Sequence, residues 1–192
     1  MKIRITLTLL ALLTAIGTTL AQNTPGEDTK AGIEMYRSGK LSEAITQFKR
    51  IVETDKKDYD AWLYLGAAYL RMDQKKEALK AFRTASRGRQ ARYKRPILEK
   101  TLENRPLVIL NKPTLYLSQQ HRTGRILGSV TLAIEFRYDG TMGFIFPVHP
   151  LPDGLTELSI SAARTFNFQP AHNGGKPVTT VILYDFIMEE QY

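Results

Sequence analysis

The sequence predicts an α+β protein, in which N-terminal helical hairpins precede a small C-terminal sheet of order ββαβ. Three observations indicate this fold class. Residue types repeat after 34 positions in the first half of the chain, side-chain character alternates along the chain from Val130, and Asp139-Gly140 separates two alternating runs. With 192 residues, 43% of them hydrophobic and 9% aromatic, the chain can form one or two small domains and is not intrinsically disordered.

The N-terminus has the three-part pattern of a secretory signal peptide. Lys2 and Arg4 precede an apolar, uncharged run, and the small residues Thr19 and Ala21 mark a cleavage point. We therefore expect residues 1–21 to be a signal peptide and the mature chain to be periplasmic. Because the uncharged run almost reaches the length of a spanning helix, an uncleaved inner-membrane anchor is the alternative.

Export limits the functions that charge and composition allow. The formal net charge of +8 falls to +6 once the signal peptide is removed. A positive charge would suit a nucleic-acid partner, but an exported chain is not expected to meet one. The complete absence of cysteine excludes a disulfide framework, thiolate catalysis, and cysteine-based zinc or iron–sulfur sites.

Residues 25–92 contain two helical repeats. Gly66 corresponds to Gly32 and Phe82 to Phe48, so small residues are expected to let paired helices approach while large residues fill the gaps between hairpins. The second unit carries the spaced set Trp62, Leu65, Gly66, Tyr69, Ala78, Phe82 and Ala85. This set resembles the tetratricopeptide repeat, and the first unit resembles a degenerate copy with Asp28, Ala31 and Met35 at the large consensus positions.

The resemblance implies a concave groove that binds extended peptides or partner helices. The positions that would line it are Ile33, Tyr36, Arg37, Asp60, Leu63, Ala67, Leu70 and Arg71. A clamp for a peptide carboxylate is not supported, because Ile33 and Ala67 replace the asparagines that such clamps use. Two interpretations of Arg37 and Arg71 stay open: solvated helix ends, or a paired basic feature of the groove.

Two repeats are too few to bury a continuous core, so something else must cover their end. A capping helix from Arg92 to Leu102, which overlaps a basic capping and linker segment at residues 93–112, is one way, and packing against the C-terminal half is the other. Positive charge concentrates from Arg83 to Arg105. We expect either a solvated helix face or contact with anionic lipid headgroups or the cell-wall polymer.

The last third of the chain predicts two strands, a helix and a third strand. Alternation from Val130 continues to Tyr138, and the second strand is expected to place Met142 and three further apolar side chains (Phe144, Phe146 and Val148) on one face. Asp153 is expected to cap a helix that runs to about Thr165. Asn173-Gly174-Gly175 turns the chain, and a strand from Val178 to Met188 follows.

An ordered set of motifs in this region resembles the TonB C-terminal domain, over residues 113–192. The set is Gly128-Ser129-Val130, Asp139-Gly140, Ala162-Ala163-Arg164, Phe166-Asn167-Phe168-Gln169-Pro170-Ala171 and Gly175-Lys176-Pro177-Val178. Phe166 and Asn167 depart from the tryptophan and basic residue of the family. The resemblance implies a module that pairs a strand edge with the N-terminal peptide of outer-membrane transporters.

By this resemblance the final strand supplies the binding edge, through Val178, Thr180, Ile182, Tyr184 and Phe186. Both faces of that strand are apolar. One face must therefore meet something beyond its own helix: the repeats, a second copy of the chain in a homodimer, or a partner.

The sequence as a whole predicts an exported adaptor that binds protein partners of the cell envelope, through the groove and the sheet edge. A TonB-type energy transducer for outer-membrane transport is the alternative. It would need an uncleaved anchor and a long proline-rich segment, and the nine prolines are scattered.

We expect neither enzymatic activity nor a cofactor. The three histidines, His121, His149 and His172, have no metal-ligand spacing. The sequence also contains neither a nucleophile elbow nor a phosphate-binding loop.

Overall fold

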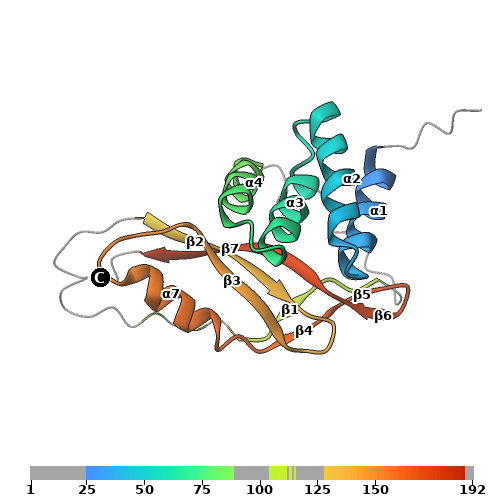
Figure 1. Ribbon diagram of the computed structural model, residues 1–192. Coiled ribbons are helices and arrows are strands. Elements are labelled where there is room, and N and C mark those ends of the chain that lie inside the picture. The colour runs from blue at the N-terminus through green and yellow to red at the C-terminus, as the bar shows by residue number, and fades with distance from the viewer. Residues whose placement is uncertain (1–24, 89–103, 112, 114, 116–127, 189–192) are drawn as a thin grey trace, which may run out of the picture.

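A computed structural model describes residues 25–88, 104–111, 113, 115 and 128–188. The expected signal peptide, the expected capping helix and most of the basic segment lie outside the described residues. Four helices, then strands with one further helix, confirm the α+β class (Figure 1). Among the described residues, no helix is long and apolar enough to cross a membrane.

The N-terminal half consists of two antiparallel helical hairpins. They are formed by α1 (Pro25–Arg37) with α2 (Leu41–Thr54), and by α3 (Tyr59–Arg71) with α4 (Lys75–Arg87). Gly39 makes the first turn with a φ of +80°, and the Asp58 side chain caps α3 by accepting a hydrogen bond from the Ala61 amide at 2.9 Å.

The 34-residue repeat reflects one packing contact made twice. A Cβ at Gly32 would lie 2.6 Å from the Phe48 ring, and a Cβ at Gly66 would lie 2.7 Å from the Phe82 ring. Both rings are fully buried. Glycine is therefore needed in α1 and α3, because a phenylalanine of the partner helix packs directly against the glycine backbone. These two contacts confirm the predicted spacing.

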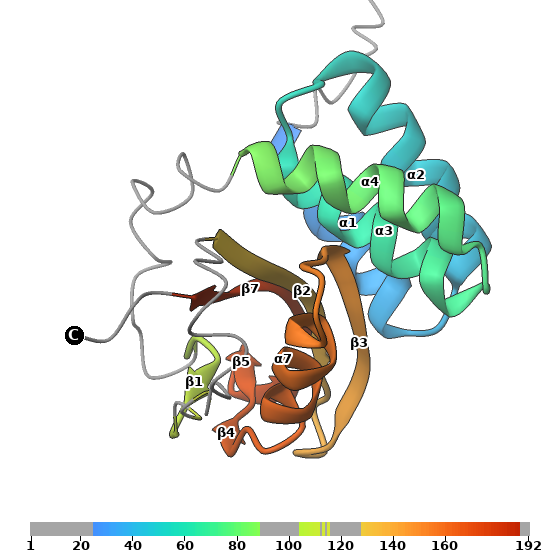
Figure 2. The same ribbon diagram turned by 90° about the vertical axis from the view of Figure 1, so that its left-hand side faces the viewer.

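The C-terminal half is built on a three-stranded antiparallel sheet of order β3-β2-β7. Its strands are β2 (Gly128–Phe136), β3 (Met142–His149) and β7 (Thr180–Met188). Helix α7 (Leu155–Ala163) covers one face, and the helical repeats cover the other, as Figures 1 and 2 show. The second apolar face of the last strand therefore packs against the repeats, which is one of the three expected ways of covering it.

The turn between β2 and β3 has three residues, 138–140, and not the predicted two. The Gly140 amide donates to the Arg137 carbonyl at 3.2 Å, and Gly140 has a φ of +82°. The Asp139 carboxylate accepts hydrogen bonds from the Thr141 hydroxyl and amide, and these bonds lower the pKa of Asp139. A turn closed by a left-handed glycine is typical of three-residue hairpin loops.

An irregular register in β3 corrects a second prediction. Phe136 pairs with Met142, whereas Ile134 pairs with Ile145, so β3 holds one extra residue at this point. Such a β-bulge changes the face on which the following side chains lie. Met142 packs on the α7 side and Phe144 packs against the repeats, so the prediction that they share a face is wrong.

The elements after β3 differ from the prediction in their ends. Gly154, with a φ of +77°, is the N-cap of α7, so Asp153 does not cap this helix as predicted. Helix α7 ends at Ala163, two residues before the predicted Thr165. Two consecutive left-handed glycines, Gly174 and Gly175, make the predicted turn.

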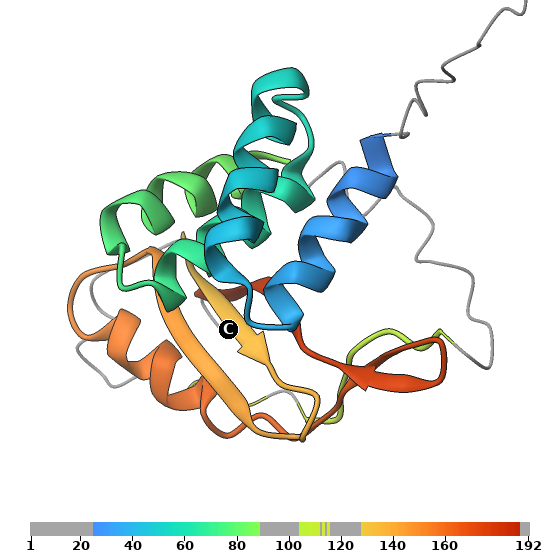
Figure 3. The ribbon, with the colours of Figure 1, turned by 45° about the vertical axis from the view of Figure 1, so that its right-hand side comes forward.

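Four short strands were not predicted. β1 (Val108–Ile109) pairs with β4 (Phe168–Gln169), and β5 (Ala171–Asn173) pairs with β6 (Lys176–Val178). The β5–β6 hairpin projects beyond the sheet on the side of α1 (Figure 3). The predicted final strand is therefore two strands, since Val178 belongs to β6 and β7 begins at Thr180.

Candidate functional site

The concave face of the helical repeats is filled by the chain's own sheet. Tyr36, Leu63 and Ala67, three of the predicted groove residues, are buried, and they share one apolar cluster with Ala133 and Val181 of the sheet. The predicted groove residues Ile33 and Leu70 are partly buried against the same cluster. In this structure the predicted groove is therefore an internal interface.

Aromatic rings extend this interface toward α4. The centroid of the Phe82 ring lies 6.3 Å from that of Phe144 and 5.9 Å from that of Phe146, both in β3. Ser86 on the same helix lies 3.0 Å from the His149 ring nitrogen Nε2. Phe82 thus joins the core of its own hairpin to the sheet.

A buried polar pair lies at the centre of the interface. The Tyr36 hydroxyl of α1 donates a hydrogen bond to the Glu135 carboxylate of β2. Glu135 is only 2% exposed, and its second oxygen accepts a hydrogen bond from Nε of Arg137 at 3.3 Å. Burial, followed by the negative charge of Glu135, raises the pKa of Tyr36, so the phenol remains protonated.

The Glu135 carboxylate occupies space that the absent side chain of Gly143 leaves free. A Cβ at Gly143 would lie 1.9 Å from the Glu135 Oε2 atom. Any larger residue at this position of β3 would therefore displace the carboxylate. The sequence carried one signal for this site: Glu135 is the only acid among the alternating residues of its strand.

The two predicted groove arginines make contacts within the chain. Nε of Arg37 donates to the Thr179 carbonyl at 3.0 Å, and its Nη1 contacts Glu34 at 2.6 Å. The Arg71 guanidinium lies 5.1 Å from the centroid of the Tyr36 ring. Arg37 is therefore not simply a solvated helix end, whereas Arg71 remains exposed on one side.

Tyr64, which the sequence did not indicate, extends these contacts to β7. Burial raises the pKa of Tyr64, and the nearby Arg37 side chain and Val181 backbone oppose that rise. Asp60, the remaining predicted groove residue, is half-buried one turn earlier on α3. Arg37 thus contacts the backbone just before β7, and Tyr64 lies beside the beginning of this strand.

β7 is an edge strand of the described sheet, since it pairs with β2 alone. Arg37 reaches the Thr179 carbonyl and Tyr64 the Val181 backbone, so odd-numbered residues direct their backbone groups away from β2. The four predicted edge residues within β7 are Thr180, Ile182, Tyr184 and Phe186; the last three pack toward α7. The outward backbone groups thus belong to residues such as Leu183 and Ile187.

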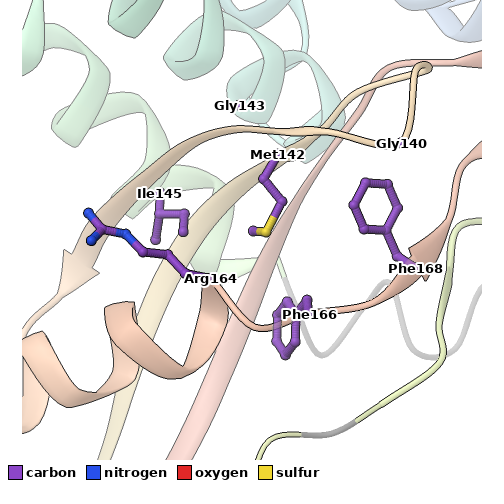
Figure 4. Close-up of a pocket in the computed structure, with 7 residues that line it drawn as sticks. All are labelled: Gly140, Met142, Gly143, Ile145, Arg164, Phe166 and Phe168. Carbon is purple, nitrogen blue, oxygen red and sulfur yellow. The ribbon is translucent and has the colours of Figure 1, made fainter.

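Two hollows among the described residues are large enough to hold a ligand group. One, of about 690 Å³, lies between α2 and α4 with α3 as its floor. The other, of about 480 Å³, lies beside the β2–β3 hairpin, where Phe166 and Phe168 face Met142 and Arg164 extends toward Ile145 (Figure 4). Within the described ranges, no group of three or more His, Asp and Glu residues could hold a metal ion.

Comparison with known families identifies the helical part of the chain. Residues 35–95 match the tetratricopeptide repeat family. No curated protein matches the sequence. The family match confirms the repeat prediction and supports a role in protein–protein interaction.

Proposed function

We propose that the protein is an exported adaptor of the cell envelope, which acts by binding protein partners and not by catalysis. The repeat match supports the interaction role, and the sequence pattern of residues 1–21 supports export to the periplasm. The resemblance of residues 113–192 to the TonB C-terminal domain suggests the kind of partner, an extended peptide of an outer-membrane transporter.

The edge of β7 that no other described strand pairs with is the single observation on which the binding mode rests. An extended peptide can add to a sheet where backbone donors and acceptors are directed outward. At the beginning of β7, Arg37 and Tyr64 contact these groups, which leaves the stretch near Ile187 for a partner. Ile187 is 64% exposed, so a partner can approach its backbone without displacing a core side chain.

A pair of substitutions at one position tests this mode. Ile187→Pro removes the outward amide, whereas Ile187→Ala keeps it and removes only an exposed side chain. We expect synthetic peptides that match the N-terminal segments of outer-membrane transporters to bind the wild type and the alanine variant, and not the proline variant. Isothermal titration calorimetry measures the affinity, and equal binding by both variants would refute edge binding.

The N-terminal mass of the protein isolated from its cells distinguishes the adaptor from the transducer. A chain that begins at Gln22 supports the exported adaptor, because an energy transducer requires its anchor. A chain that retains residues 1–21 contradicts cleavage and favours the transducer.

A further inference from the structure

The hollow between α2 and α4 lies on the side of the repeats that is turned away from the sheet. Its α4 residues include Lys80 and Thr84, about half a helical turn around the axis from Phe82, which contacts the sheet. With a volume of about 690 Å³, it can accept several side chains of a partner. We call this hollow the α2–α4 groove.

The floor of the α2–α4 groove is apolar and aromatic. Leu65 is 3% exposed, while Trp62 and Tyr69 on the same face of α3 are only half-buried. These two large residues were expected to fill the gaps between hairpins, and here they keep part of their rings open. The Trp62 indole already donates its hydrogen bond to the Lys56 carbonyl at 3.1 Å, so the surface it leaves open is apolar.

The rim of the groove is mainly basic. Lys49 and Lys56 lie on one side, and Lys80 and Arg87 on the other; the acids of the rim are Glu53 and Glu77. Lys49 lies 5.8 Å from the centroid of the Tyr69 ring. Among the described residues, no ion pair neutralises any of the four cations. An acidic ligand is therefore complementary to this rim.

We propose that the α2–α4 groove binds a short acidic peptide segment of a partner protein. An apolar or aromatic side chain of the segment packs between Trp62 and Tyr69, and its carboxylates contact Lys49 and Lys80. The helical repeats would then bind through the face opposite the usual concave one, which the sheet occupies. The surface is separate from the β7 edge, so this proposal and the proposed function can fail independently.

Trp62 provides a direct readout, because it is the only tryptophan of the chain. The probe is a synthetic peptide with three copies of Glu-Phe-Asp-Leu, and the control peptide carries lysine at every acidic position. Added to the full chain, the acidic peptide should change the Trp62 emission to saturation, and its affinity should fall as salt is raised. The basic peptide should give no saturable change.

Charge reversal locates the binding surface. The double variant Lys49→Glu/Lys80→Glu should weaken binding of the acidic peptide by about tenfold or more. The matched control Lys30→Glu/Lys176→Glu carries the same change of net charge at exposed positions that do not line the groove, and it should bind like the wild type. Circular dichroism of each variant establishes that it is folded.

Three results would overturn the proposal. The first is equal affinity of the two double variants for the acidic peptide, or equal affinity of the wild type for the acidic and the basic peptide. The second is a Trp62 response to vesicles rich in phosphatidylglycerol without a response to the acidic peptide, which would assign the groove to a membrane surface. The third is a shift in Trp62 emission, together with a gain in affinity for the acidic peptide, in the double variant Ile97→Asp/Leu98→Asp. That result would make residues 89–103 of the chain the occupant of the groove.

Discussion

The two faces of the three-stranded sheet are both buried, but different interactions bury them. The face toward α7 is made of apolar side chains, with the Phe136 ring packed against Phe166 and Phe168 at centroid distances of 6.1 and 4.8 Å. The face toward the repeats adds a carboxylate, Glu135, whose partner Tyr36 comes from the other half of the chain.

The two faces of the sheet therefore differ in how they contribute to stability and to the specificity of packing. Apolar contact stabilises in proportion to the area buried and tolerates small shifts, whereas a hydrogen bond to a buried carboxylate requires one arrangement. Apolar contacts, such as those of Phe82 with Phe144 and Phe146, are present on the repeat face as well. The repeat face fixes how the helical hairpins sit on the sheet.

The largest expected effect comes from breaking the α7 face. Phe136→Ala removes a fully buried ring and leaves a cavity beside two other aromatic side chains, which should lower the free energy of unfolding by about 3–5 kcal/mol. Urea denaturation followed by circular dichroism measures the change. The exposed Tyr138→Ala is the control, and a similar loss there would contradict the assignment of the core.

A smaller effect is expected from the repeat face. Tyr36→Phe leaves the Glu135 carboxylate without its tyrosine donor, which should lower the free energy of unfolding by about 1.5–3 kcal/mol. The double variant Tyr36→Phe/Glu135→Leu removes both polar groups and should recover part of that loss. A double-mutant cycle from urea denaturation measures the coupling, and strict additivity would show that the pair contributes nothing.

Alkaline pH should weaken the same face gradually. Burial raises the pKa of Tyr36 and of Tyr64 above the value near 10 that they have in the unfolded chain. The unfolded chain therefore loses these protons first, and stability that is fully present below pH 10 declines as the pH rises above it. Each tyrosine contributes at most about 1.4 kcal/mol per pH unit.

Urea denaturation between pH 8 and pH 11 measures this decline, and Tyr36→Phe should make it less steep. An unchanged slope in that variant would show that Tyr36 ionises equally easily in the folded protein. The same measurement also distinguishes the two faces of the sheet. The Phe136→Ala variant, altered on the α7 face, should lose stability with pH as steeply as the wild type.

The sequence predicted those features that depend on regular spacing. Gly32 and Gly66 lie opposite Phe48 and Phe82 because the same hairpin is built twice, so a period of 34 was enough to find them. The alternation from Val130 likewise predicted β2, whose inward side chains do lie on the α7 face. Spacing is local information, and these contacts are local within one hairpin or one strand.

The remaining features depend on contacts between distant segments. The bulge in β3 adds one residue between Ile145 and Met142, and an alternating pattern does not show which residue is extra. The site at Glu135 needed knowledge that α1 lies over β2, ninety-nine positions away along the chain. Repeat resemblance predicted Tyr36 to line a groove, but it could not indicate that the sheet covers Tyr36.

The glycine at position 143 has a consequence for how this protein can vary. The carboxylate of Glu135 lies where a Cβ of residue 143 would be, so Glu135 in this position requires glycine at position 143. The Tyr36 hydroxyl donates a hydrogen bond to the same carboxylate. Three residues from two structural halves are thus coupled, and a substitution at one of them changes which residues fit at the other two.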